Sequence, residues 1–279
     1  MRISFGVTSA SLAIAACLAW PGTASAIGDL TINVNCAGGR TIGQALSRPT
    51  VVDRRLVIVI NGTCSENVTI ARDDVVLRSA GGGGVAATDP SVAAIYIDGA
   101  KRVSLENLVV TGGHEGVRVT NGGSATIRGS TVHNAGLHGV LVLFGANARV
   151  EDSVLDSNGQ YGLAVNGGTA TLLGSSVRNN NFSGIVVVNA SALNLGQVDD
   201  AGNVCCGNTI ENNRLDGLTV ARVSTTRLYG NTIRSNGVAD RLRASTFHPA
   251  ELEGLRCRDR NSRSQQYNPK APGRRHSEL

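Results

Sequence analysis

The sequence predicts an all-β protein whose chain winds into a single-stranded solenoid of about seven coils. The first observation is a repeat of 22 or 23 residues, whose cycles open with glycine and an aliphatic residue at Gly116-Val117, Gly139-Val140, Gly162-Leu163, Gly184-Ile185 and Gly217-Leu218. The second is that short apolar runs follow these openings at matching distances, bounded by Gly and Asn. A fixed period of about twenty residues with such short β-type runs is typical of a solenoid, in which each repeat contacts only its neighbours.

Alternation within the runs predicts which side chains fill the core. Apolar residues occupy every second place, so one coil would direct Val117, Val119, Ile127 and Val132 inward. Equivalent positions one coil apart would then stack on one another, with every strand paired in parallel. Because crossovers between parallel strands are almost always right-handed, we expect a right-handed parallel β-helix.

Residues 27–50 are expected to form an N-terminal cap with one short helix. Thr41 to Gln44 fits a capping box, in which the Thr41 hydroxyl accepts from the Gln44 amide and the Gln44 side chain reaches back. Such a cap would cover the core and the unpaired strand edge of the first coil. Cys36 and Cys64 flank the cap, and an oxidising compartment would permit a disulfide between them.

Residues 51–237 are predicted to form the β-helix itself. The first coil would be a wider one with three strands, at 56–60, 67–70 and 75–77. Later in the chain, the interval between Gly184 and Gly217 lengthens to 33 residues. The extra stretch, about 196–207, is expected to be one lateral loop.

The N-terminus has the pattern of a targeting segment. Residues 1–26 combine a charged start at Arg2, an apolar stretch and a small-residue cleavage site, which together indicate a signal peptide. Alternatively, Ile14-Ala15-Ala16-Cys17 resembles the lipobox of bacterial lipoproteins, with Cys17 as the lipid anchor. Either interpretation predicts export, as a secreted or periplasmic protein. No later run is apolar and long enough to span a bilayer.

The formal charge of +5 belongs to the ends of the chain. Residues 238–279 contain nine Lys and Arg against five Asp and Glu, and Arg2 supplies one more positive charge, so residues 27–237 have no net charge. We therefore expect no nucleic-acid partner for the repeats. The segment 238–279 is poor in β-branched residues, which predicts a basic, disordered tail.

The turns show a further regularity. Three residues past the third apolar run stand Asn158, Asn180, Asn213 and Asn236, with Ala135 in the same place earlier. Asparagine tolerates the left-handed conformation of tight corners, and stacked amides can bond to each other. This column and the glycine openings resemble the right-handed parallel β-helix repeats of the pectate-lyase-like superfamily, over roughly residues 51–237. The resemblance implies the fold, but that fold hosts lyases, hydrolases, epimerases, adhesins and non-enzymes.

Two columns of charge are predicted on the coil surface. Glu106, Arg128 and Glu151 each follow the second apolar run, and His133, Asp156, Arg178, Glu211 and Arg234 each follow the third. One interpretation is a ligand-binding groove for an acidic polysaccharide, in which Arg178 and Arg234 bind carboxylates. The other, which we favour, is a solvated ladder that keeps the strands in register.

A small group of side chains could support acid–base chemistry. His114, Glu115 and His138 lie in neighbouring coils, and His138 and Tyr161 both directly precede a glycine opening, so these two are expected to stack with Glu115. His133 belongs to a different corner. The sequence shows no local motif of lyases or epimerases, so no catalytic residue is assigned from the resemblance, and the favoured interpretation is that these residues decorate loops.

No metal or cofactor is required by any pattern in the sequence. Asp199 and Asp200 would offer oxygens to Ca²⁺, but one short acidic run falls short of the usual six to eight ligands, and a turn is the favoured interpretation. Cys205 and Cys206 would be either a vicinal disulfide or two free thiols.

Short loops, which cannot enclose a pocket, and the small number of aromatic side chains favour binding over catalysis. The single tryptophan, Trp20, lies in the leader, most other aromatic residues lie on separate coils, and most loops are short. We expect an exported, monomeric, non-catalytic module at the surface or in the periplasm that binds a glycan or a protein. The alternative is a carbohydrate-active enzyme, a polysaccharide lyase or epimerase acting on acidic polysaccharide.

Overall fold

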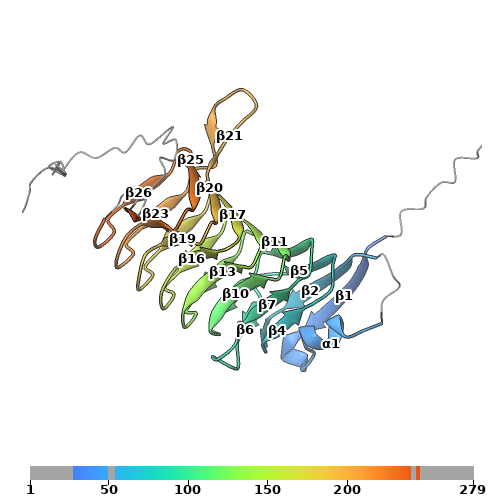
Figure 1. The fold of residues 1–279 in the computed structure, drawn as a ribbon. Helices are drawn as coiled ribbons and strands as arrows, with labels where there is room; N and C mark the ends of the chain where they lie inside the picture. The colour runs from blue at the N-terminus through green and yellow to red at the C-terminus, as the bar shows by residue number, and fades with distance from the viewer. Residues whose placement is uncertain (1–27, 50–53, 240–242, 246–279) are drawn as a thin grey trace, which may run out of the picture.

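The computed structural model describes residues 28–49, 54–239 and 243–245, and these form a right-handed parallel β-solenoid. Figure 1 shows an elongated stack of coils, with the short helix at one end and a projecting hairpin near the other. The predicted signal peptide, Cys17 and most of the predicted tail lie outside the described residues. In the described part of the chain, no helix is long and apolar enough to cross a membrane.

Successive coils contribute strands to three parallel sheets, which we call sheets A, B and C. Sheet A contains β1 (Leu30–Asn35), β2 (Leu56–Asn61), β5 (Val75–Ser79), β8 (Val103–Glu106), β11 (Ser124–Arg128), β14 (Asn147–Glu151), β17 (Thr169–Leu173), β20 (Ala192–Leu195) and β25 (Thr225–Leu228). Sheet B contains β3 (Thr63–Ser65), β6 (Gly84–Ala86), β9 (Val109–Thr111), β12 (Thr131–His133), β15 (Val154–Asp156), β18 (Ser176–Arg178), β23 (Thr209–Glu211) and β26 (Thr232–Arg234). Sheet C contains β4 (Val68–Ile70), β7 (Ile95–Asp98), β10 (Glu115–Thr120), β13 (His138–Leu143), β16 (Leu163–Asn166), β19 (Ile185–Val188), β24 (Leu218–Ala221) and β27 (Arg243–Ser245).

The solenoid has about nine turns, where the sequence predicted about seven. One difference is β1, which lies inside the predicted cap and pairs in parallel with β2. The other is the stretch 56–77, predicted as a single coil, in which β5 already begins the next turn on top of β2. A single residue, Gly62 with a φ of 79°, separates β2 from β3. The corner between the two strands is therefore too short to be recognised in the sequence.

The core consists of equivalent side chains stacked one turn apart. Val117 aligns with Val140, Val140 with Leu163, and Leu163 with Ile185, and all four are fully buried. The inward residues predicted for one coil, Val117 among them, are all buried. The repeat therefore winds as predicted, and its outward positions remain available for function.

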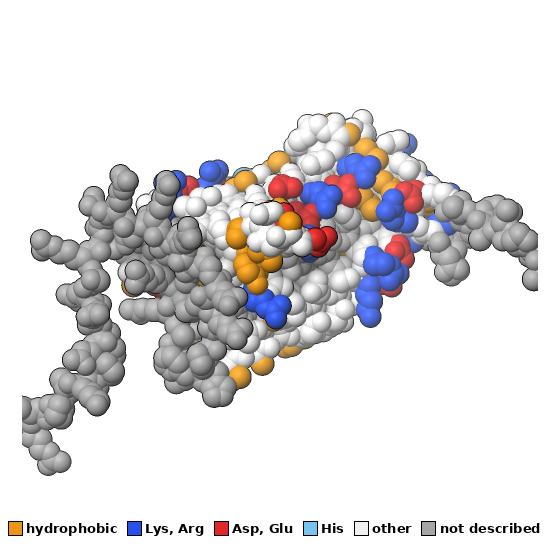
Figure 2. All heavy atoms as spheres, turned by 90° about the horizontal axis from the view of Figure 1, so that it is seen from above, with side chains coloured by type: hydrophobic (Ala, Val, Ile, Leu, Met, Phe, Trp, Pro, Cys, Tyr) orange, Lys and Arg blue, Asp and Glu red, His pale blue; other side chains and the backbone are white. Residues whose placement is uncertain are grey.

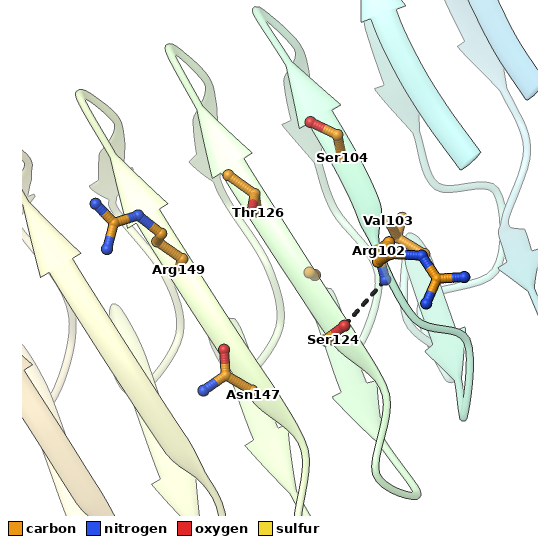
Figure 3. Close-up of a pocket in the computed structure, with 8 residues that line it drawn as sticks. Arg102, Val103, Ser104, Ser124, Thr126, Asn147 and Arg149 are labelled. Carbon is orange, nitrogen blue, oxygen red and sulfur yellow. Dashed lines mark hydrogen bonds between the residues drawn. The ribbon is translucent and has the colours of Figure 1, made fainter. Parts of the chain in front are cut away.

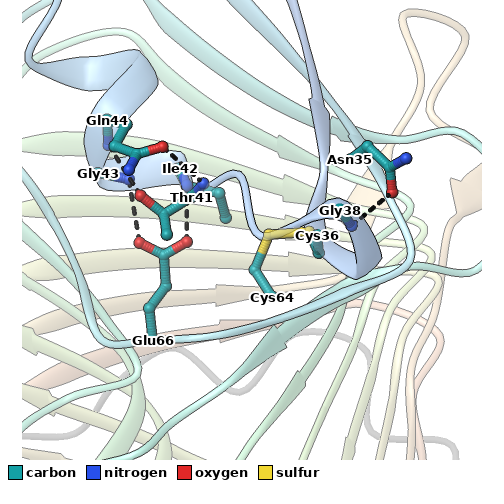
Figure 4. The surroundings of a disulfide bond; sticks show 9 residues. All are labelled: Asn35, Cys36, Gly38, Thr41, Ile42, Gly43, Gln44, Cys64 and Glu66. Atoms are coloured by element: carbon teal, nitrogen blue, oxygen red, sulfur yellow. Dashed lines mark hydrogen bonds between the residues drawn. A yellow bond between two sulfur atoms is a disulfide. The ribbon is translucent and has the colours of Figure 1, made fainter.

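The N-terminal helix α1 (Ile42–Leu46) has the predicted capping box. The Thr41 hydroxyl accepts from the Gln44 amide at 3.1 Å, and the Thr41 amide donates to the Gln44 side chain at 3.3 Å. Glu66, from the turn after β3, adds a cap that local spacing did not predict: its carboxylate accepts from the amides of Ile42 and Gly43 at 2.6 and 3.0 Å (Figure 4). A carboxylate at this end of a helix is favourable, because the amides there lack partners.

A disulfide ties the cap to the first turn. Cys36, in a short 3₁₀ helix (Cys36–Gly38), bonds to Cys64 of β3, as predicted (Figure 4). The bond joins residues 28 positions apart, on either side of α1. It therefore fixes the cap against the solenoid end that it covers.

The asparagine column forms a hydrogen-bonded ladder between sheets B and C. The side-chain amides of Asn158, Asn180 and Asn213 donate to the next Asn in the column at 2.8–2.9 Å. The predicted left-handed conformation belongs instead to the preceding residue in each turn, at Ser157, Asn179, Asn212 and Ser235. That residue turns the chain, and the asparagine after it can then point inward along the stack.

A second ladder lies between sheets A and B and was not predicted. Backbone amides in this turn donate to the side chain one turn further on, along Ser130, Ser153, Ser175, Asn208 and Asn231. The column changes from serine to asparagine half-way, so no single residue type marks it in the sequence.

The predicted lateral insertion is a β-hairpin of β21 (Gln197–Val198) and β22 (Val204–Cys205), which projects from the stack (Figure 1). Cys205 and Cys206 are free thiols. Parallel pairing also continues beyond residue 237, where β27 pairs with β24 and Ala239 forms a bridge with Asp216.

Candidate functional site

One row of side chains at the start of sheet C brings together most of the acid–base candidates. Strand register aligns the residues that precede the glycine openings, and we call them the polar row: Glu115, His138, Tyr161, Ser183 and Asp216. His114 lies beside the row, next to Glu115. His133 lies on sheet B, in another row.

Close packing explains the glycine that follows each member of the polar row. A Cβ atom on Gly139 would lie 2.7 Å from Asn158 Nδ2, and one on Gly162 would lie 2.4 Å from a methyl group of Val177. Any larger residue would push the strand away from the asparagine ladder. The glycines thus place the polar row where the chain enters sheet C.

Two neighbouring buried polar atoms at the Glu115 end of the row lack a protein partner. The Glu115 side chain is buried, with Oε1 2.8 Å from His114 Nδ1, whereas its Oε2 has no hydrogen bond. Nδ1 of the neighbouring His138 has none either. A buried polar atom without a partner costs about 1–3 kcal/mol, so these atoms would gain from a bound water molecule.

His138 is neutral at physiological pH. Burial lowers its pKa to about 4, against the opposing effect of the Glu115 charge, which raises the pKa. The neutral imidazole can accept a proton or a hydrogen bond on one nitrogen and donate from the other.

Aromatic rings continue the row towards the C-terminus. The rings of His138 and Tyr161 stack with centroids 5.3 Å apart, and Phe182 meets Tyr161 edge-on at 5.9 Å. Phe182 is 39% exposed. The sequence suggested aromatics scattered over separate coils, but Tyr161 and Phe182 are 21 residues apart, close to one period, and stacking of the coils therefore makes them neighbours.

The far end of the row is a small hydroxyl and carboxylate network that sequence patterns missed. The Thr219 hydroxyl lies 3.1 Å from Ser183 Oγ and donates to Asp216 Oδ2 at 3.2 Å. The other Asp216 oxygen is buried without a hydrogen bond. Register with the glycine openings is the signal that could have found Ser183 and Asp216.

Beside the polar row, the outer face of sheet C is largely apolar over β13, β16 and β19, between Arg118 of β10 and Thr219 of β24. Leu141, Leu143, Ala164 and Val186 form a cluster of their own, separate from the core, with Tyr161 and Val188 packed against it. Phe144, just past β13, is 65% exposed. This face therefore combines an apolar floor, exposed aromatic rings and a line of polar groups.

The loop between β6 and β7 borders this face at its N-terminal end. Asn67 holds the loop: its Oδ1 accepts from the Asp89 amide at 2.8 Å, and its Nδ2 donates to Ala93 O at 3.0 Å. The His114 amide donates to Val92 O of the same loop at 2.8 Å. The loop is therefore fixed beside His114 and Glu115.

In the predicted charge column on sheet B, the arginines pair with carboxylates of the same column. His133, Asp156, Arg178, Glu211 and Arg234 are aligned in register. Arg178 lies 3.6 Å from Asp156, and Arg234 lies 2.7 Å from Glu211. Each guanidinium already has a carboxylate, which supports the ladder interpretation, and ligand binding by this column stays a prediction.

The acidic run in the hairpin forms a turn. One Asp199 oxygen accepts from the amides of Ala201 and Asn203 at 3.0 and 2.7 Å, and the other accepts from the Asn203 side chain at 3.1 Å. Among the residues that the structure describes, no three His, Cys, Asp or Glu side chains gather to hold a metal ion. Ca²⁺ binding at Asp199 and Asp200 stays a prediction.

Comparison with known proteins places the chain in a family. The family described as right handed beta helix region matches residues 93–250, more than half of the chain. The chain belongs to this family. Among solved structures, it is similar to the pectate lyase Pel9A, at 12% identity and a TM-score of 0.52 over 79% of each chain. It is also similar to the periplasmic alginate epimerase AlgG, at 12% identity and a TM-score of 0.38, over 78% of this chain and 68% of that one.

These similarities are structural. No curated protein matches the sequence significantly. At such low identity, the likeness to Pel9A shows the shared β-helix fold, and the function has to be argued from the site.

Proposed function

We propose that the protein is an exported, non-catalytic β-helix module that binds a glycan along the outer face of sheet C. The observation that carries this proposal is the pair of neighbouring aromatic rings, Tyr161 and Phe182, along the polar row. Aromatic rings offer a flat apolar surface to the C–H face of a sugar, and neighbouring polar groups can bond to its hydroxyls.

The regular spacing of the row suits a polymer. Stacked strands repeat every ~4.8 Å, so the row offers a carboxylate, an imidazole, a phenol and a hydroxyl at regular intervals along the solenoid. The partly exposed imidazole of His114 and phenol of Tyr161 would bond to sugar hydroxyls.

Export is supported by the pattern of residues 1–26 and by the disulfide of the cap. Disulfides form and persist mainly in oxidising compartments. Together they favour a secreted or periplasmic protein, as expected from the sequence.

The test is glycan binding by a pair of matched tyrosine variants. Tyr161→Ala should weaken binding at least tenfold, measured by titration with glycans selected on an array. Tyr229→Ala removes a half-buried tyrosine beside sheet A and should leave the affinity unchanged. Equal affinity of wild type and Tyr161→Ala for every bound glycan would contradict the proposal.

A second function, an enzyme acting on acidic polysaccharide, is favoured by one specific observation. The neutral His138 lies between the Glu115 carboxylate and the Tyr161 phenol, the kinds of group that could exchange protons with a sugar ring. Tyr161→Phe separates the two functions, because it keeps the ring and removes the hydroxyl. A lyase or epimerase would lose product formation while still binding the polymer, whereas a binding module would form no product with either residue.

A further inference from the structure

A groove lies on sheet A, away from the polar row. It has a volume of about 370 Å³ and is lined by Arg102, Val103, Ser104, Ser124, Ala125, Thr126, Asn147 and Arg149 (Figure 3). Its volume falls in the lower part of the range of about 300–1,000 Å³ that is usual for small-molecule sites. The residues come from three adjacent strands, β8, β11 and β14, and from Arg102, which directly precedes β8.

Side-chain size creates the groove. Ser104, Thr126 and Arg149 are consecutive in one outward row, as the strand register shows. The first two are short, so the floor is low, and the long Arg149 side chain closes the end. In Figure 3, Arg102 and Arg149 stand at opposite ends, with the hydroxyls of Ser104, Ser124 and Thr126 between them.

The groove is rich in hydrogen-bonding groups that point to solvent. Ser124 Oγ accepts from the Arg102 amide at 2.9 Å, so its own hydrogen is free to donate elsewhere. Asn147 is exposed and contributes both an acceptor and donors. Thr126 adds a hydroxyl at the centre, which is the chemistry needed to bind a hydroxyl-rich molecule.

The Arg149 end carries an excess positive charge. One row of charges runs along the edge of the groove: Arg78, Glu106, Arg128 and Glu151, joined by Arg149. Three guanidinium groups therefore share two carboxylates. Figure 2 shows such acidic and basic side chains close together on the face that carries the hairpin.

Both carboxylates of this row are ionised near neutral pH. Burial raises the pKa of Glu151, but hydrogen bonds from Arg128 and Arg149 outweigh it and hold the pKa below its usual value. At the other end of the groove, Arg102 is paired with Asp73 and Asp74, so its charge is already neutralised. Arg149, in contrast, shares the Glu151 carboxylate with Arg128, so its charge is only partly neutralised.

We propose that this groove binds a small hydroxyl-rich carboxylate, such as a sugar acid, with the carboxylate on Arg149 and hydroxyls on Thr126, Ser124 and Asn147. Arginine suits a carboxylate because its planar group can donate two parallel hydrogen bonds. The site is independent of the glycan surface on sheet C, since the two lie on different sheets.

The experiment titrates the full chain with D-glucuronate and, in parallel, with uncharged D-glucose, by calorimetry or NMR. Saturable binding of glucuronate at least tenfold tighter than that of glucose is expected. Arg149→Gln should reduce the glucuronate affinity to that of glucose, because the charge is removed. No saturable glucuronate binding, or equal binding of both sugars by wild type, would overturn the proposal.

A matched pair of variants locates the site. Thr126→Gln fills the groove and should weaken glucuronate binding at least tenfold, whereas Thr171→Gln, further along the same outward row and outside the groove, should not. If Thr126→Gln folds poorly by circular dichroism, Asn147→Leu at an exposed position replaces it. Binding that survives these changes but disappears in Tyr161→Ala would place the ligand on sheet C and refute this site.

Discussion

At the residue scale, the side chains of the polar row differ from ordinary surface residues in their enclosure. Glu115 is 3% exposed, and His138 lies between it and the Tyr161 ring. The imidazole therefore stays neutral in the folded protein although an acidic side chain is its neighbour. That neutrality has a measurable cost when the pH falls.

We predict that His138 makes the protein less stable in mild acid. Its pKa is about 4 in the folded chain and 6.5 in the unfolded chain, so falling pH adds a proton to the unfolded state first. The stabilisation is fully present above about pH 6.5, falls as the pH approaches 4, and amounts to up to about 3 kcal/mol. Urea unfolding at a series of pH values measures it.

His138→Phe should remove this dependence between about pH 6.5 and 4.5, where the carboxylates with lowered pKa values remain ionised. His133→Phe, at a half-buried position on sheet B, serves as the control and should keep the wild-type profile. Parallel pH profiles for wild type and His138→Phe would show that the imidazole is not held neutral by the fold.

At the element scale, turns between strands are held by ladders that run through several coils. Asn180 is buried, donates to Asn213 and accepts from both the backbone and the side chain of Asn158. The sequence predicted this ladder because one residue type recurs at one place. It could not predict the ladder from Ser130 to Asn231, because two residue types, serine and asparagine, accept the same backbone hydrogen bond there.

We predict that Asn180→Ala lowers the free energy of unfolding by about 2–4 kcal/mol, because it leaves buried partners without hydrogen bonds. Asn147→Ala, at an exposed position, should change it by less than about 0.5 kcal/mol. Denaturant titrations of both variants provide the comparison. Similar small effects would mean that the stacked amides contribute little to stability.

At the scale of the whole molecule, a solenoid is weakest at its ends, because a terminal coil has only one neighbour. The N-terminal end is closed by β1, by α1 and by the disulfide from Cys36 to Cys64. Glu66 adds a carboxylate from the first turn to the start of the helix. The cap is thus attached both covalently and by hydrogen bonds.

We predict that replacing Cys36 and Cys64 together by serine lowers the free energy of unfolding by about 3.5 kcal/mol, the value for a closed loop of this length. Dithiothreitol should bring wild type to the level of the variant. Cys205→Ser, which alters a free thiol in the hairpin, is the control and should have little effect. An unchanged midpoint in the double variant would show that the disulfide does not limit stability.

The amino-acid sequence by itself determined the winding of the chain, the inward residues, the asparagine column and the capping box. These features depend on residue types that recur at a fixed period or on local spacing, and stacking places like residues together wherever the period holds. Only the tertiary structure decided the number of turns, the capping role of Glu66 and the meeting of Tyr161 with Phe182. It also decided the groove beside Thr126, because outward side chains do not repeat, and their neighbours depend on where each turn places them in space.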